Sequence, residues 1–150
     1  MKGYQNIVCA IDLSEFSGLV IERAVDQCGQ HDAKLTLLHV IENFPEDRTN
    51  EMIAPEDIDP ARYHEQEALA RLSDLAAQLD CRDAERAVQF SIYSAGREIV
   101  RYADEHQVDL IVVGSHGHNG LTSLLGSTAN RVVQTAPGDV LAVRIRNSTA

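Results

Sequence analysis

Short apolar runs alternate with helical patterns along the chain, and this alternation constrains the fold more than any other feature. The predicted strands are residues 6–11, 34–40, 88–93, 110–113 and 139–143. The predicted helices are one capped by Ser14 or Ser17, then 61–79, 96–106 and 127–135. Residues 41–60 are expected to form a long surface loop. Strands separated by helices in this way predict an α/β fold with a single, doubly wound, five-stranded parallel sheet and helices on both faces.

A glycine-bearing loop joins the fourth predicted strand to the last helix. Gly114 and Gly117 follow the apolar run, and Gly126 and Ser127 precede the residues that indicate a helix start. Glycines let a backbone approach a ligand closely, and the free N–H groups of a first helical turn point at anions. We therefore predict that this loop holds the phosphates of a nucleotide.

A second loop is placed to face the first one. In doubly wound sheets, ligands bind beyond the carboxyl ends of the strands, where the strand order reverses. The loop after the first strand carries Asp12, and the loop after the fourth carries Gly114. If the first and fourth strands are neighbours, these two loops border one cleft.

The formal net charge of −10 argues against a nucleic-acid partner, because the chain on average repels a phosphate backbone. A length of 150 residues favours one domain over 1–150. With no apolar run of membrane-spanning length and no signal-peptide pattern, we expect a cytoplasmic protein without a membrane partner. Cys9, Cys28 and Cys81 form no C-x-x-C pair and are interpreted as reduced thiols.

These segments, taken together, resemble the universal stress protein family. The matching segments are residues 7–14, 31–40, 109–117, 124–129 and 139–143. The resemblance covers essentially the whole chain and is weakest over residues 43–87. It implies a sheet in the order 3-2-1-4-5, which makes the first and fourth strands neighbours.

The resemblance also implies a site for ATP or AMP with Mg²⁺ or Mn²⁺. In the nucleotide-binding members, a Gly-x-x-Gly-x9-Gly-Ser/Thr loop holds the nucleotide. An aspartate after the first strand lies by the adenosine and the cation, and the residue ending the second strand packs on the adenine. Carried over to this sequence, the site consists of Ala10, Asp12, Val40, Val113, Gly114, Ser115, Gly117, His118, Gly126, Ser127 and Thr128. His116 and His118 have no third ligand nearby, so no protein-held metal is expected.

Two departures leave an alternative open. Only eight residues separate Gly117 from Gly126, one fewer than in the family's nucleotide-binding loop. Residues 11–15 and 31–35 look most like the founding subclass of the family, which lacks the glycine signature and does not bind ATP. The alternative is a dimeric stress protein that binds no nucleotide and acts only through protein partners.

Catalysis has little support in the sequence. Phosphoryl transfer needs charge neutralisation on the transferring group. The only lysines are Lys2 and Lys34, far from the glycine motif, and there is no Gly-Lys-Ser/Thr loop. Slow ATP hydrolysis at most is expected, and whether the protein is an enzyme stays open.

The last predicted strand indicates how the chain associates. Val140 to Val143 are apolar and would lie at the edge of the sheet, where an exposed strand is usually covered or paired. In the family that the chain resembles, this strand pairs with its mate in a second subunit. We therefore predict a symmetric homodimer through residues 139–145.

Overall fold

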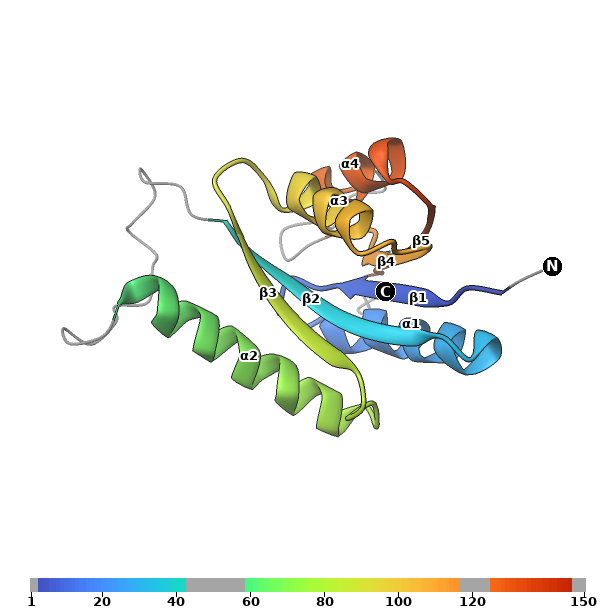
Figure 1. The fold of residues 1–150 in the computed structure, drawn as a ribbon, viewed down its shortest axis with the longest axis horizontal. Helices are drawn as coiled ribbons and strands as arrows, with labels where there is room; N and C mark the ends of the chain where they lie inside the picture. Colours follow the sequence, from blue (N-terminus) through green and yellow to red (C-terminus); the bar gives the residue numbers. More distant parts are fainter. Residues whose placement is uncertain (1–2, 43–58, 117–124, 147–150) are drawn as a thin grey trace.

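The computed structural model describes residues 3–42, 59–116 and 125–146 of the chain (Figure 1). Its strands are β1 (Asn6–Ala10), β2 (Lys34–Glu42), β3 (Glu85–Ser91), β4 (Leu110–Gly114) and β5 (Asp139–Val143). Its helices are α1 (Ser17–His31), α2 (Pro60–Gln78), α3 (Ala95–Glu105) and α4 (Ser127–Thr135). The strands form one parallel sheet in the order β3-β2-β1-β4-β5. The predicted fold class and strand order are confirmed.

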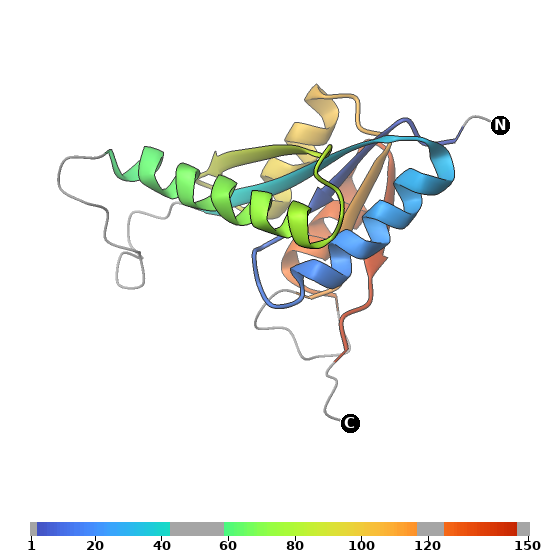
Figure 2. The same cartoon turned by 90° about the horizontal axis from the view of Figure 1, so that it is seen from below.

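Helices cover both faces of the sheet, because successive side chains of each strand point to opposite sides. On one face, Ile7 and Cys9 of β1 pack in a cluster with Ile21 of α1 and Leu72 of α2. On the other face, Val8 and Ala10 pack with side chains of α3 and α4 such as Ile99 and Val132. Figure 2, seen from below, has α1 and α2 in front of the sheet. The apolar runs of the inner strands are thus buried on both sides.

The ends of β3 differ from the prediction. The strand begins at Glu85 and stops at Ser91, whereas residues 88–93 were expected. Ile92 and Tyr93 are 66% and 60% exposed and lie in the turn before α3. Their apolar character suggested strand, but the ladder with β2 ends at the pair Glu42–Ser91. The predicted loop at 41–60 is also shortened at both ends, since β2 continues to Glu42 and α2 starts at Pro60; the loop's residues 43–58 lie outside the described residues.

The start of α1 also differs from the prediction, which gave the cap to Ser14 or Ser17. Phe16 occupies the N-cap position and makes no side-chain capping hydrogen bond. Ser14 instead accepts a hydrogen bond at its Oγ from the N–H of Phe16, at 3.3 Å. Ser17 is the first residue of the helix and is buried.

The strand order brings the carboxyl ends of β1 and β4 together. Ala10 at the end of β1 is the partner of Val113 in β4. The loops that follow these strands lead into α1 and α4, which lie on opposite faces of the sheet. The switch point expected to bind a ligand is therefore at this edge. Across the described residues, no helix combines the length and the apolar character needed to cross a bilayer.

Candidate functional site

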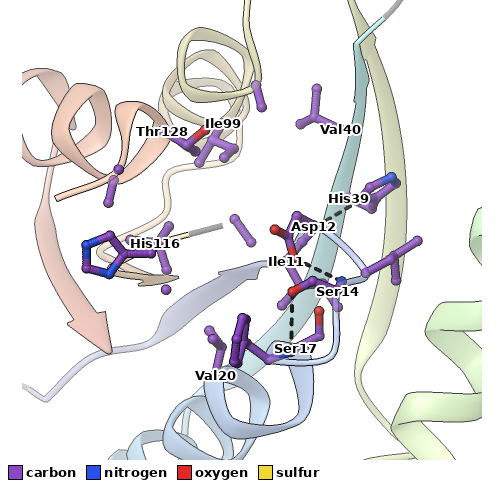
Figure 3. Close-up of a pocket in the computed structure, with 18 of the residues that line it drawn as sticks. Ile11, Asp12, Ser14, Ser17, Val20, His39, Val40, Ile99, His116 and Thr128 are labelled. Carbon is purple, nitrogen blue, oxygen red and sulfur yellow. Dashed lines mark hydrogen bonds between the residues drawn. The ribbon is translucent and has the colours of Figure 1, made fainter. Parts of the chain in front are cut away.

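A cavity of about 660 Å³ opens at the carboxyl ends of β1 and β4 (Figure 3). This volume is within the usual range of small-molecule sites. All the predicted site residues that the structure describes line it: Ala10, Asp12, Val40, Val113, Gly114, Ser115, Gly126, Ser127 and Thr128. The other two, Gly117 and His118, lie outside the described residues. The structure therefore brings together side chains that are more than a hundred positions apart in sequence.

One wall of the cavity is apolar. Its strand residues, Ala10, Val40 and Val113, are buried at the ends of β1, β2 and β4. Ile99 of α3 and Ala129 of α4 are also buried and close the wall from the helix side. Figure 3 shows Val40 and Ile99 projecting into this part of the cavity. Small and branched aliphatic side chains leave a slot whose apolar walls suit the faces of a flat ring.

Asp12 follows β1 and is exposed at the mouth of the cavity. Its Oδ1 accepts a hydrogen bond from the N–H of Ser14 at 3.0 Å, which closes a local turn. Oδ2 makes no hydrogen bond with any other described residue. The carboxylate is thus fixed by one oxygen and presents the other for an external donor or cation.

The start of α4 forms the polar end of the cavity. Gly126 is the N-cap, with φ −65° and ψ 164°, and no side chain caps the helix. The first turn contains no acidic residue. The N–H groups of Ser127 and Thr128 donate to no other described residue, and they carry the positive end of the helix dipole. This end of the cavity is suited to an anion.

Ser115 ties this end of the cavity to the sheet. Its N–H donates to the carbonyl of Val143 at 2.7 Å, and its own carbonyl accepts from the N–H of Gly126 at 2.7 Å. Its Oγ accepts from the N–H of Ile145 at 2.8 Å and lies 3.0 Å from Nδ1 of His116. Ser115 lines the cavity, but its main chain is bonded to β5 and to the start of α4, and its side chain is bonded to the N–H of Ile145 after β5.

Gly114 is close to other protein atoms as well as to the cavity. A Cβ at this position would lie 3.3 Å from Cγ2 of Val20 and 3.3 Å from the carbonyl oxygen of His116. The glycine therefore allows α1 and the turn after β4 to approach each other closely. Gly114 is therefore needed for packing, whether or not it also contacts a ligand.

His39 of β2 lies beside the turn that carries Asp12. Its Nδ1 lies 2.9 Å from the carbonyl oxygen of Ile11 (Figure 3). A carbonyl only accepts, so Nδ1 carries the proton and donates. Burial lowers the pKa of His39 below its ordinary value, which keeps the ring neutral. His39 is thus a half-buried histidine with a satisfied hydrogen bond.

No group of three or more His, Cys, Asp or Glu side chains is arranged to hold a metal ion among residues 3–42, 59–116 and 125–146. Asp12 and Glu42 are the carboxylates that line the cavity, and Glu42 Oε2 accepts from the N–H of Ala95 at 3.1 Å. A cation in this cleft would thus need the ligand's own oxygens to complete its coordination.

The sheet, the switch-point cavity and the uncapped helix start define an α/β domain of the doubly wound class with a ligand cleft at its carboxyl edge. The model of the universal stress protein family matches residues 3–144. The chain belongs to this family, as the sequence resemblance indicated.

Individual relatives agree with this assignment. Universal stress protein A homolog 1 of Coxiella burnetii is 36% identical over 140 residues, which are 93% of this chain and 96% of that protein. The solved universal stress protein UspA from Lactobacillus plantarum has a TM-score of 0.70 at 26% identity, with 95% of this chain and 99% of that chain covered. A universal stress protein crystallised in complex with cAMP has a TM-score of 0.65 at 26% identity, covering 94% and 97%.

Sequence reasoning missed part of the cavity wall. Ala95, Ile99 and Ala129 line the cavity, yet none was assigned to the site. Helical spacing alone does not tell whether an inward-facing residue such as Ile99 contacts the core or lines a cavity. Only the placement of α3 and α4 over the end of the sheet makes that distinction.

Proposed function

We propose that the protein binds an adenine nucleotide, ATP or AMP, in this cleft and acts as a nucleotide-sensing stress protein in the cytoplasm. One observation carries the proposal. A single cavity joins an apolar slot, an exposed carboxylate and a helix start whose first N–H groups donate to no other described residue. These are the groups that a base, a ribose with its cation, and a phosphate respectively require. The cAMP complex of a similar universal stress protein supports an adenine nucleotide as the ligand class.

The cavity suggests how the ligand lies. The adenine packs between Val40 and Ile99 in the apolar slot. The ribose hydroxyls donate to the free oxygen of Asp12. The phosphates accept from the N–H groups of Ser127 and Thr128 at the positive end of α4. Asp12 would hold Mg²⁺, which would neutralise phosphate charge, because this ion is usually bound by one or two carboxylates together with substrate phosphates and water.

The proposal is binding without rapid turnover. The described residues that line the cavity include neither lysine nor arginine. Neutralisation of the charge on a transferring phosphoryl group would therefore depend on the cation and the backbone N–H groups alone. We expect the nucleotide to be held rather than consumed, with the protein's assembly or its partners changing with occupancy.

Titration calorimetry with Mg-ATP and with AMP tests the proposal, using Asp12→Asn as the site variant. Asparagine keeps an oxygen for the N–H of Ser14 but loses the charge, so the turn is retained. We expect Mg-ATP to bind roughly tenfold or more weakly, as for loss of a hydrogen bond to a charged group. Asp26→Asn, on the exposed face of α1, removes the same charge away from the cleft and is the matched control. Absence of a binding signal for the unmodified protein at millimolar nucleotide would refute the proposal.

The edge strand supports a second part of the proposal, a symmetric homodimer through residues 139–145. β5 pairs only with β4 within the chain, so its other edge has no strand partner among the described residues. Its central side chains Val140, Leu141 and Ala142 are half-buried, and Val133 on the adjacent α4 is 48% exposed. An apolar edge of this kind is suited to pair with a second copy.

The alternative function, a dimer that binds no nucleotide and acts through protein partners, would use the same edge. Sedimentation at micromolar concentration tests the dimer independently of the ligand. We expect a dimer for the unmodified chain and a monomer for Leu141→Lys, which places a charge in the centre of the interface. A monomeric unmodified chain would refute the dimer and leave nucleotide binding untouched.

A further inference from the structure

We infer that Arg71 of α2 is a positioning residue that sets the loop presenting Asp12 to the ligand. This inference rests on the proposed nucleotide site. Arg71 does not line the cavity. Its Nη2 donates to the carbonyl oxygen of Leu13 at 2.6 Å, across 58 positions of sequence. The helix that carries it packs on the α1 face of the sheet, as Figure 2 shows.

The loop needs such support because Leu13 has an unfavourable backbone conformation. Its φ is 61°, in the left-handed region that non-glycine residues rarely adopt. Leucine has neither the freedom of glycine nor the local hydrogen bond of asparagine to stabilise this conformation. Residues held in sparsely populated backbone regions persist only where their surroundings determine them, and they cluster at ligand sites. The hydrogen bond between Asp12 and Ser14 helps to hold Leu13 in this conformation, and so does the hydrogen bond from Arg71.

A second side chain holds the other flank of Asp12. The ring of His39 donates to the carbonyl of Ile11 at 2.9 Å, one residue before Asp12, and Arg71 donates to the carbonyl one residue after it. The two donors come from β2 and α2, which are separate elements of the fold. Asp12 therefore lies between two backbone anchors, and its carboxylate is held at the mouth of the cavity before any ligand arrives.

The anchors make a specific prediction about affinity. Without the bond from Arg71, Leu13 gains access to ordinary backbone conformations, and each of these redirects the carboxylate of Asp12. Only the molecules with Leu13 in the left-handed conformation then bind the nucleotide well. The apparent affinity falls because this fraction is smaller, although no contact with the ligand has been removed. Arg71 is exposed, so its removal changes the core little. The effect on binding should therefore exceed the effect on unfolding.

Three variants separate positioning from a general effect of charge. Arg71→Met keeps the apolar stem and cannot donate. Arg71→Lys keeps a donor of similar reach and is the conservative rescue. Arg62→Met removes the same charge from an exposed position of the same helix, and Arg62 makes no hydrogen bond or ion pair with another described residue. AMP affinity is measured by calorimetry, urea unfolding gives stability, and NMR of the ligand-free protein gives the Cα and Cβ chemical shifts of Leu13.

For Arg71→Met we expect AMP affinity to fall roughly three- to tenfold, the effect of one net hydrogen bond. We also expect the Leu13 shifts to move away from left-handed values and the unfolding midpoint to stay nearly constant. Arg71→Lys should restore most of both properties, and Arg62→Met should change neither.

Unchanged Leu13 shifts in Arg71→Met would overturn the inference, as would changed shifts with unchanged affinity or an equal effect of Arg62→Met. If the unmodified protein binds neither AMP nor Mg-ATP, the proposed function fails. In that case the Leu13 shifts alone decide whether Arg71 sets the loop.

Discussion

Replacing Gly96 with alanine tests how tightly α3 and α4 pack beside the cleft. Gly96 is buried in the first turn of α3. An added Cβ would lie 2.9 Å from Cβ of Arg131 and 3.3 Å from the carbonyl oxygen of Thr128. Neither atom is the far end of a flexible side chain, so the start of α4 must move outward. Thr128 lines the cavity, which couples this packing contact to the site.

The expected magnitude follows from a comparison with Gly29 in α1. Neither glycine has a positive φ, so alanine is tolerated by the backbone at both positions. Nothing lies within 4 Å of a Cβ at Gly29, so Gly29→Ala should stabilise the protein by up to about 1 kcal/mol through helix propensity alone. At Gly96 the same gain is opposed by overpacking of about 1–3 kcal/mol. The two variants should therefore differ by about 1–3 kcal/mol in free energy of unfolding, with Gly96→Ala the less stable.

Urea unfolding at one fixed protein concentration measures this difference, because an associating protein is more stable when concentrated. Equal slopes with different midpoints would assign the change to stability. Adding Arg131→Ala to Gly96→Ala removes the Cγ that would lie 3.0 Å from the new methyl group, and should recover part of the loss. If Gly96→Ala proves as stable as Gly29→Ala, the close approach of α3 and α4 is not a constraint, and this reasoning is refuted.

Three further predictions concern the core, the cavity frame and pH. Leu72→Ala, at a fully buried position of α2, should cost about 2–5 kcal/mol in urea unfolding; a cost under 1 kcal/mol would contradict tight packing there. Ser115→Ala should cost about 1–3 kcal/mol, because it leaves the buried N–H of Ile145 unpaired, and Ser115→Thr is the comparison that keeps an acceptor. His39 has a lowered pKa when folded, so the unfolded chain binds more protons; its stability contribution is present above the ordinary value of 6.5 and is lost as the pH falls through the folded pKa. Unfolding between pH 5 and pH 7 should therefore depend less on pH in His39→Gln than in the unmodified protein.

The fold was predictable because its signals are local. Buried parallel strands are continuous apolar runs, and residues 110–113 and 139–143 were placed as strands within one residue. The errors occurred where burial, rather than residue type, decides the structure. Ile92 and Tyr93 have strand-forming side chains, yet they project from a turn after the β2–β3 ladder has ended. Likewise, two serines near α1 suggested a cap, but the chain places Phe16 at that position.

The site residues that lie at strand ends and helix starts could be predicted from the sequence. Asp12 lies two residues after the end of β1, and residues 126–128 form the N-terminal end of α4, so the topology alone carries them to the carboxyl edge of the sheet. Ile99 and Arg71 have no such signal. One reaches the cavity and the other the Asp12 loop only through the packing of helices from distant parts of the chain. Contacts between elements are the information that a single sequence does not display.

The glycine loop is one residue shorter than in the nucleotide-binding members of the family, and the structure shows how this affects the start of α4. The N–H of Gly126 donates directly to the carbonyl of Ser115, so the start of α4 is bonded to the end of β4. This bond sets the distance between the two ends of the loop, whatever the number of residues between them. The one-residue difference in loop length therefore does not move the N–H groups of Ser127 and Thr128, which donate to no other described residue. If residues 126–128 bind the phosphate as proposed, AMP should bind more tightly than adenosine; equal affinities would show that the phosphate gains nothing there.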